Sequence, residues 1–209
     1  MIDPKNFYSA VRRAFQPLTR GLAEHGVTPN MLTMVGIALN LGAAALIVLG
    51  DFYWAAGVFV VASFCDMLDG SVARYAGKES AFGAFLDSTT DRISEGIILA
   101  GLGLYFARVH HYGELAAIFV FLIASFLVSY TRARAEALGL ECKVGLMSRP
   151  ERIIVLTTGF IFHRWYVLTI AVYALAVLTS FTVVQRVLHV RRQLRRADLA
   201  EPARPAAAD

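Results

Sequence analysis

The sequence contains few cysteines and few charged residues. Its 209 residues include only Cys65 and Cys142, which excludes a disulfide framework and leaves no paired spacing typical of a metal site. Charged residues make up 17% of the chain, and no nucleic-acid-binding module is visible beside the net charge of +4. Internal repeats and signs of a second domain are also lacking. The first 30 residues have no compact apolar segment after a basic start, so a cleavable signal peptide is not expected.

Apolar residues, by contrast, are abundant. They make up 57% of the chain, and the mean hydropathy is +0.56, which is more than a soluble domain of this size needs. Several apolar runs approach the roughly 20 residues with which a helix crosses a bilayer. We therefore expect an all-α integral membrane protein with six transmembrane helices, at about residues 31–49, 53–76, 81–107, 114–139, 149–163 and 165–189.

The two ends of the chain have different patterns. Over residues 1–27, apolar side chains recur at helical spacing opposite basic ones, which predicts an amphipathic helix lying in the membrane surface. Residues 1–190 as a whole then form the membrane domain. From residue 191 the chain becomes basic and then rich in Ala and Pro, which predicts a surface-bound turn followed by a disordered cytoplasmic tail over 191–209.

Four aspartates interrupt the apolar pattern. Asp66 and Asp69 are three residues apart, and Asp87 and Asp91 are four apart, so each pair lies on one face of its helix. A short polar turn around Lys78 joins the two helices as an antiparallel hairpin. Counted from Lys78, each aspartate of the first helix has a counterpart at nearly the same depth in the second. The spacing predicts a four-carboxylate cage between the helices.

Such a cage needs cations. Like charges at close range repel strongly, and a low dielectric increases the repulsion. Oxygen-only ligands favour Mg²⁺ or Mn²⁺, and four carboxylates can hold two ions. Gly70 and Gly83 would let a ligand or a facing backbone approach closely. Carboxylates that merely cap helix ends would explain one or two aspartates, but not a matched set of four.

These aspartates belong to a longer motif, Asp66-x2-Asp69-Gly70-x2-Ala73-Arg74-x8-Gly83-x3-Asp87-x3-Asp91. Position for position, it resembles the signature of the CDP-alcohol phosphatidyltransferases, and the expected spans are similar to that family over most of the chain. The resemblance implies an enzyme of phospholipid biosynthesis that moves a phosphatidyl-type group from a CDP-linked lipid to the hydroxyl of a second alcohol and releases CMP. It also implies a homodimer, although no interface motif is visible in the sequence.

The resemblance implies roles for the motif residues as well. Asp66, Asp69 and Asp87 would be the main metal ligands, and Asp91 a bridging ligand or the general base. A carboxylate near metals is a weak base, so Asp91 would act mainly by positioning the hydroxyl as it loses its proton. Small residues would admit the cytidine nucleotide and Arg74 would pair with phosphate. The expected CDP-lipid contacts are Asp66, Gly70, Ala73, Arg74 and Gly83.

Arginines near the ends of three spans point to the acceptor. Arg149 and Arg152 open the fifth span, where Ser148 and Glu151 resemble a capping box. A helix N-terminus flanked by two arginines suits a phosphate group. Arg134 is as consistent with the positive-inside bias of membrane proteins as with a place in the site. We expect the acceptor's phosphate to be bound by Arg132, Arg149, Arg152 and Arg186.

The stretch "SYTRARAE…GLMSRPER" resembles the branch of the family that uses inositol 1-phosphate, namely the phosphatidylinositol phosphate synthases and their archaeal relatives. The expected product is therefore phosphatidylinositol phosphate or an ether-lipid analogue. Alternative acceptors are glycerol 3-phosphate, although the Gly-Lys-x-Lys-Thr stretch of that branch is not found, and free inositol. A transporter lined with carboxylates would show paired halves, which are not found. A purely structural membrane partner would not explain the spacing.

The basic residues predict the orientation. With six spans, most Lys and Arg outside the helices fall on the side of both termini, so the positive-inside rule places the termini in the cytoplasm of a cell membrane. Cysteines introduced at Lys78 and Lys143 are therefore expected to react with an impermeant reagent from the cytoplasmic side. Cysteines at His110 and His111 are expected to react from the outside. Labelling of all four positions from one side would contradict the six-span arrangement.

Overall fold

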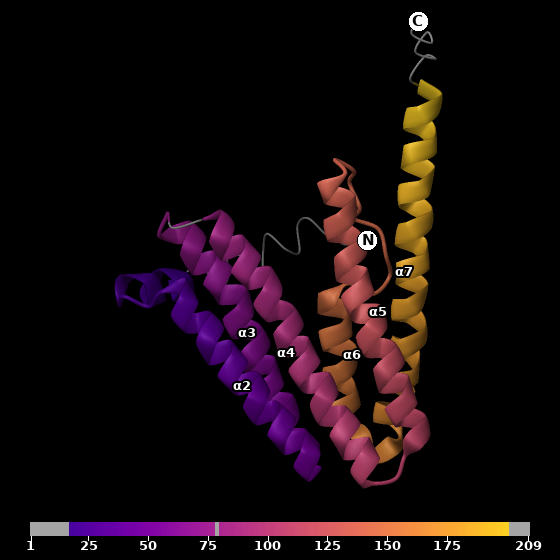
Figure 1. Ribbon diagram of the computed structural model, residues 1–209. Helices are drawn as coiled ribbons and strands as arrows, with labels where there is room; N and C mark the ends of the chain where they lie inside the picture. The colour runs from indigo at the N-terminus through magenta and orange to yellow at the C-terminus, as the bar shows by residue number, and fades with distance from the viewer. Residues whose placement is uncertain (1–16, 78–79, 201–209) are drawn as a thin grey trace, which may run out of the picture. The chain divides into compact units, whose positions relative to one another are not determined.

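The computed structural model describes residues 17–77 and 80–200, which are helical with short connections. The chain divides into two compact units, residues 1–105 and 106–209. Within the described residues no strand occurs, as the sequence predicts. The elements, shown in Figure 1, are α2 (Pro29–Leu49), α3 (Phe52–Tyr75), α4 (Ala81–Arg108), α5 (Tyr112–Ala137), α6 (Arg149–Ile161), the 3₁₀ turn η1 (His163–Trp165) and α7 (Val167–Ala200).

The first unit contains α2, α3 and α4 up to Tyr105, which lie alongside one another in Figure 1. Helix α2 begins where the Thr28 hydroxyl accepts a hydrogen bond from the Met31 amide and Pro29 occupies the first turn. It ends at Gly50, whose φ of +91° is a left-handed conformation that glycine adopts without a steric penalty. This tight turn sends α3 back along α2, so that their facing sides bury each other.

Close contacts also join α4 to the other two helices of this unit. A methyl group at Gly101 of α4 would lie 3.0 Å from both the Cβ and the carbonyl oxygen of Ala44 in α2. The ring of Phe52, in α3, meets Tyr105 edge to face with centroids 4.8 Å apart. The small residue at position 101 therefore permits the close approach of α2 and α4.

The second unit contains α5, α6, η1 and α7. Helix α7 packs against both α5 and α6. The core of this unit is apolar and includes the fully buried side chains of Phe121, Phe160, Val172 and Leu175. In Figure 1, α7 continues well past the adjacent end of α5.

Four helices are long and apolar enough to cross a membrane: α2, α3, α5 and residues Val167–Arg196 of α7. The chain is therefore a multi-pass membrane protein. The two further spans that the sequence predicts coincide with α4 and α6, and they remain predictions. Helix α4 carries four charged residues within its first 15 residues, and α6 has only 13 residues, so neither meets the length and composition of an independent span.

The ends of the chain can be compared with their predictions only in part. Most of the predicted amphipathic helix over residues 1–27 lies outside the described residues, but residues 17–24 are helical. Leu22 and Ala23 pack against a small core formed by Leu32, Leu68 and Val72. The turn predicted after residue 190 is wrong, because α7 continues without a break to Ala200. Its Arg, Leu and Ala residues favour helix. Residues 201–209 lie outside the described residues.

The contact between α2 and α4 predicts a difference in stability. Gly101→Ala places its Cβ against the backbone of Ala44, and overpacking of this kind costs about 1–3 kcal/mol. Gly57→Ala in α3 is the matched control, because a Cβ there meets nothing within 4 Å. Thermal denaturation in detergent is expected to show a lower Tm for Gly101→Ala only. Equal Tm values for the two variants would mean that the helices can separate at no cost.

Candidate functional site

A cavity of about 510 Å³ opens in the first unit. Its walls come from the N-terminal ends of α2 and α4 and from the last turns of α3. Six motif residues lie in its lining: Asp69, Gly70, Ala73, Arg74, Gly83 and Asp87. A Cβ added at Gly70 would meet no atom within 4 Å, so this residue leaves part of the cavity open. Six of the eight motif residues therefore line one cavity, and Asp66 and Asp91 lie outside this lining.

Asp69 is the most buried acidic group of this cavity, with 4% of its surface exposed. Its Oδ2 accepts a hydrogen bond from the Thr33 hydroxyl of α2 at 2.8 Å, and its Oδ1 accepts one from the Gly70 amide. No Lys or Arg in the described part of the chain forms an ion pair with it. Hydrogen bonds therefore orient a buried carboxylate whose charge they do not neutralise.

The neighbouring aspartates add charge of the same sign. Asp66 and Asp87 lie near enough for their charges to act on Asp69. Asp66 is half-buried, and its carboxylate lies against Gly36 of α2, where a Cβ would be 2.5 Å from Oδ1. Asp87 is exposed toward the cavity, and Asp91 is half-buried one turn further along α4. Asp69 and Asp87 thus line the cavity, whereas Asp66 and Asp91 do not belong to its lining.

The donor chemistry of this group fits hard divalent cations. All its ligand atoms are carboxylate or hydroxyl oxygens, which Mg²⁺ and Mn²⁺ prefer, and like charges near a buried carboxylate need a cation between them. Among the residues that the structure describes, no three acidic, His or Cys side chains lie close enough together to hold a metal ion. The assignment of the four aspartates as metal ligands therefore remains a prediction.

Two helix N-termini contribute residues to the lining of the same cavity. At the start of α2 these are the residues around Thr28, Pro29 and Asn30. At the start of α4, the Ser80 hydroxyl accepts a hydrogen bond from the Gly83 amide at 3.0 Å and caps the helix. Helix N-termini attract anions, and the exposed guanidinium of Arg74 adds a positive charge. One side of the cavity is thus suited to phosphate and the other to cations.

The sequence reasoning missed the residues that α2 contributes. Thr28, Pro29, Asn30 and Thr33 line the cavity, and Gly36 makes room for Asp66. The Thr-Pro-Asn stretch is a helix-start signal that could have marked the first three. Thr33 and Gly36 carry no such signal, because their role depends on how α2 packs against α3.

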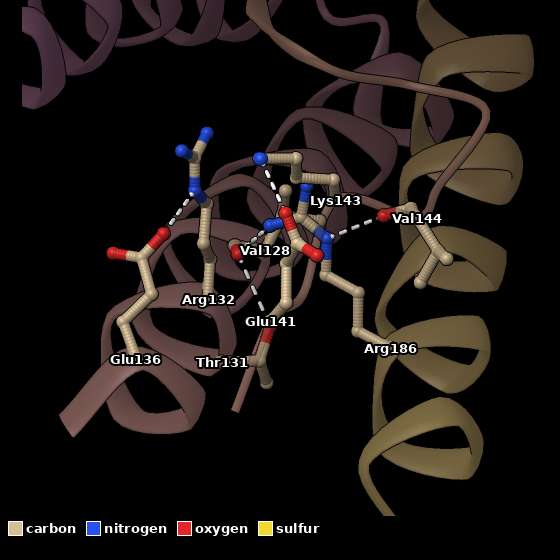
Figure 2. A network of polar contacts seen from close by, with 8 residues as sticks. All are labelled: Val128, Thr131, Arg132, Glu136, Glu141, Lys143, Val144 and Arg186. Atoms are coloured by element: carbon tan, nitrogen blue, oxygen red, sulfur yellow. Dashed lines mark hydrogen bonds and ion pairs between the residues drawn. The ribbon is translucent and has the colours of Figure 1, made fainter. Parts of the chain in front are cut away.

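The arginines predicted to bind phosphate lie in the second unit, and two of them are buried. Arg186 of α7 is 6% exposed and Arg152 of α6 is 3% exposed. Arg186 donates from Nε to the Val144 carbonyl at 2.9 Å and from Nη1 to the Val128 carbonyl (Figure 2). Arg152 donates to the Met147 carbonyl at 3.0 Å. Both side chains therefore hold the backbone of the α5–α6 loop (residues 138–148), and Arg186 also holds the backbone of α5 at Val128.

The other arginines are more accessible. Arg132 is exposed and forms an ion pair with Glu136, with 2.8 Å between Nε and Oε1 (Figure 2). Its charge and that of Arg152 act on Arg186, so three of the four predicted residues lie near one another. Arg149 is half-buried at the start of α6, and Arg134 is exposed.

The predicted capping box at the start of α6 is formed only in part. Ser148 occupies the N-cap position and Pro150 lies in the first turn. The Ser148 hydroxyl donates to the Glu151 carboxylate and accepts no hydrogen bond from the backbone. The first turn therefore keeps amides that Ser148 does not satisfy, which suits the binding of an anion there.

The family of this chain follows from a match to a family model. Residues 26–184 match the model of the CDP-alcohol phosphatidyltransferases, a range that contains the cavity and three of the four predicted phosphate-binding arginines, all but Arg186. The chain belongs to this family. It is thus an enzyme of the transferase class, as the motif predicts.

Three relatives are similar over nearly the whole chain. The phosphatidylinositol phosphate synthase of Streptomyces avermitilis is 38% identical over 203 residues, which cover 91% of this chain and 83% of the relative. The archaetidylinositol phosphate synthase of Methanothermobacter thermautotrophicus is 35% identical over 193 residues, covering 90% and 94%.

The third relative has been solved by crystallography. Phosphatidylinositol phosphate synthase of Mycobacterium tuberculosis with CDP-DAG bound superposes with a TM-score of 0.80 at 34% identity, covering 94% of this chain and 98% of the other. A second structure of that protein, in complex with manganese and citrate, gives a TM-score of 0.77 at 36% identity, covering 92% and 91%.

Proposed function

We propose that this enzyme transfers a phosphatidyl group from CDP-diacylglycerol, or from an ether-lipid analogue, to inositol 1-phosphate. The products are phosphatidylinositol phosphate and CMP. The observation that carries the proposal is the cavity of the first unit. Its lining combines the buried carboxylate of Asp69 with two helix N-termini and Arg74. The names of the similar proteins, which all specify an inositol phosphate product, support the choice of acceptor.

The nucleotide end of the lipid binds in this cavity. Its diphosphate lies against the amides at the starts of α2 and α4, and Arg74 pairs with one phosphate. Gly70, Ala73 and Gly83 carry no bulky side chain, so they leave room for cytidine. The bound CDP-DAG of the mycobacterial relative supports a lipid of this class as donor.

The aspartates serve the transfer itself. Asp66, Asp69, Asp87 and Asp91 hold two divalent cations, Mg²⁺ or Mn²⁺, which neutralise charge on the attacked phosphoryl group and on the departing phosphate. The manganese in the crystals of the mycobacterial relative supports this assignment. Asp91 acts mainly by positioning the acceptor hydroxyl, whose proton it takes up as a weak base. The hydroxyl oxygen forms a new bond to the phosphorus that carries the diacylglycerol, and the bond from that phosphorus to the bridging oxygen breaks, so CMP leaves.

The arginines of the second unit bind the phosphate that the acceptor already carries. Arg132 and Arg149 present accessible guanidinium groups for this purpose, and the buried Arg152 and Arg186 add positive charge from behind. A phosphorylated acceptor brings an anion to this set of positive charges, whereas a neutral alcohol such as free inositol brings none. The clustering of positive charge therefore favours a phosphorylated acceptor.

The proposal extends to the setting of the enzyme. The excess of basic residues near both termini supports a site on the cytoplasmic side of the cell membrane, where soluble sugar phosphates are available. We further propose that the enzyme works as a homodimer, as the family resemblance implies.

The metal assignment predicts a strict requirement for divalent cations. Activity, measured as CMP release, is expected to need Mg²⁺ or Mn²⁺ and to disappear with chelator. Loss of a residue that supports a metal ligand typically costs 10–100-fold in metal affinity or activity. Loss of a ligand itself should cost more, so Asp66→Asn, Asp69→Asn or Asp87→Asn should each reduce turnover to below about a hundredth. Asp91→Asn should keep CDP-lipid binding better than it keeps catalysis. Full activity in excess EDTA would contradict the two-metal assignment.

The acceptor site predicts a substrate-specific defect. A charge-assisted hydrogen bond to phosphate contributes roughly 1.5–3 kcal/mol, so Arg149→Ala should weaken use of inositol 1-phosphate by about ten- to a hundred-fold. Its use of CDP-lipid should change little. Arg149→Lys should rescue only partly, because the fork geometry of the guanidinium is lost. The measurement is the dependence of CMP release on each acceptor, with inositol 1-phosphate, free inositol and glycerol 3-phosphate compared.

Arg186→Ala is expected to behave differently from Arg149→Ala, since Arg186 also holds the backbone at Val128 and Val144. It should lower both the use of the acceptor and the Tm. A wild-type enzyme that prefers free inositol, with Arg149→Ala unchanged, would rule out the phosphate site. A preference for glycerol 3-phosphate would keep the phosphate site and move the enzyme to another branch of the family.

A further inference from the structure

Helix α2 turns one polar face toward the aspartates. Thr33, Gly36 and Asn40 are spaced three and four residues apart, so they lie on the same side of the helix. All three are buried, and Thr33 and Asn40 are only 7% and 2% exposed. A polar face of this kind is not placed toward lipid, where its groups would lose hydrogen bonds at a cost. It faces the interior of the first unit.

Thr33 makes the most direct contact from this face. Its hydroxyl lies 2.8 Å from Asp69 Oδ2 and 3.1 Å from the carbonyl oxygen of Pro29, one helical turn earlier. A hydroxyl has one proton to donate, and an ionised carboxylate accepts a stronger hydrogen bond than a neutral carbonyl. The proton is therefore directed to Asp69. Because the Gly70 amide holds the other oxygen, both oxygens of this carboxylate have fixed directions.

Gly36 acts on the second aspartate by leaving space. The Asp66 carboxylate lies where a side chain at position 36 would begin, with Oδ1 2.5 Å and Cγ 3.7 Å from the ideal Cβ position. The Asn40 amide donates to the Gly36 carbonyl at 2.9 Å, so this part of α2 has an added hydrogen bond within the helix. Any larger residue at position 36 would have to displace the Asp66 carboxylate.

The two contacts have the same spacing on both helices. Thr33 and Gly36 are three residues apart on α2, as Asp66 and Asp69 are on α3, and because the helices run antiparallel, Thr33 meets Asp69 while Gly36 meets Asp66. One face of α2 thus determines where two carboxylates of the motif can lie. It does so from outside the motif, through one donated hydrogen bond and one missing side chain.

We infer that Thr33 and Gly36 are positioning residues, which hold Asp69 and Asp66 in the geometry that binds the divalent cations. The inference rests on the metal assignment of the proposed function and deepens it. Outer partners of metal ligands typically contribute 10–100-fold to metal affinity, and a ligand displaced by a clash should lose at least as much. The consequence is measurable as weaker binding of the metal itself.

The test measures Mn²⁺ binding to the purified full-length enzyme by electron paramagnetic resonance, without CDP-lipid or acceptor. Thr33→Val keeps the shape and removes the donor, and it is expected to weaken Mn²⁺ binding by about 10–100-fold. Thr33→Ser keeps the hydroxyl and is expected to stay near wild type. Thr158→Val in α6 is the matched control, because that hydroxyl bonds only to the Ile154 carbonyl of its own helix; its Mn²⁺ binding should not change.

Gly36→Ala provides an independent variant on the same helix. It is expected to weaken Mn²⁺ binding about tenfold or more, whereas Gly42→Ala, where a Cβ meets nothing within 4 Å, should bind as wild type does. Both substitutions replace glycine by a better helix former, so a loss of helix stability cannot account for a difference between them. The Tm of each variant is measured in parallel, and Gly36→Ala decides the outcome if Thr33→Val does not fold.

Several results would overturn the inference. Wild-type Mn²⁺ affinity in both Thr33→Val and Gly36→Ala would show that α2 does not position the ligands. Equal losses in Thr33→Ser and Thr33→Val would show that the hydroxyl is not the reason. Failure of the proposed acceptor looks different, since it changes which alcohol releases CMP and leaves Mn²⁺ binding intact. A wild-type enzyme that binds no Mn²⁺ would remove the metal assignment and this inference together.

Discussion

The burial of negative charge between apolar helices is the constraint on which the rest of this structure depends. Asp69 is almost fully buried, and the charges of Asp66 and Asp87 act on it. A carboxylate in such surroundings costs free energy unless hydrogen bonds and cations compensate it. The neighbouring features each supply part of that compensation, through the Thr33 hydroxyl, the Gly70 amide and the positive ends of two helices.

The same constraint explains how the two units differ. In the first unit the buried charge is the carboxylate of Asp69, and the helices approach closely at small residues such as Gly36 and Gly101. In the second unit, basic groups are buried, and backbone carbonyls at Val128, Val144 and Met147 accept their hydrogen bonds. Each unit thus concentrates one sign of charge.

The sequence predicted the helices well because their signals are local. Thr28 with Pro29, and Ser80 before Gly83, mark helix starts, and apolar runs of about 20 residues mark the bodies. Spacing alone places Asp66 and Asp69 on one face of α3, and the charge of Asp66 does act on Asp69. The end of α7 was misjudged because a change from apolar to basic residues was taken as the end of the helix. Leaving the membrane does not require the backbone to stop being helical.

Other features could not be predicted, because they depend on how helices pack. No pattern within α2 indicates that Thr33 meets Asp69 or that Gly36 gives way to Asp66, since both contacts depend on the register of α2 against α3. Arg186 could be expected to point inward, but its hydrogen bonds to two carbonyls from α5 and the α5–α6 loop arise from tertiary structure. Spacing therefore identified the chemical groups, while their supporting partners required coordinates.

The shortness of α6 has a consequence for how water and lipid meet. Its 13 residues rise about 20 Å, whereas the hydrocarbon layer is about 30 Å thick. The irregular α5–α6 loop precedes this helix, and side chains of Arg152, Thr182 and Arg186 form hydrogen bonds with its backbone. Non-helical backbone at membrane depth persists only inside protein or beside water. If α6 stands across the bilayer, the aqueous phase dips locally to reach its N-terminus. A water-soluble substrate then meets the lipid at the level of the headgroups while the lipid stays in its leaflet.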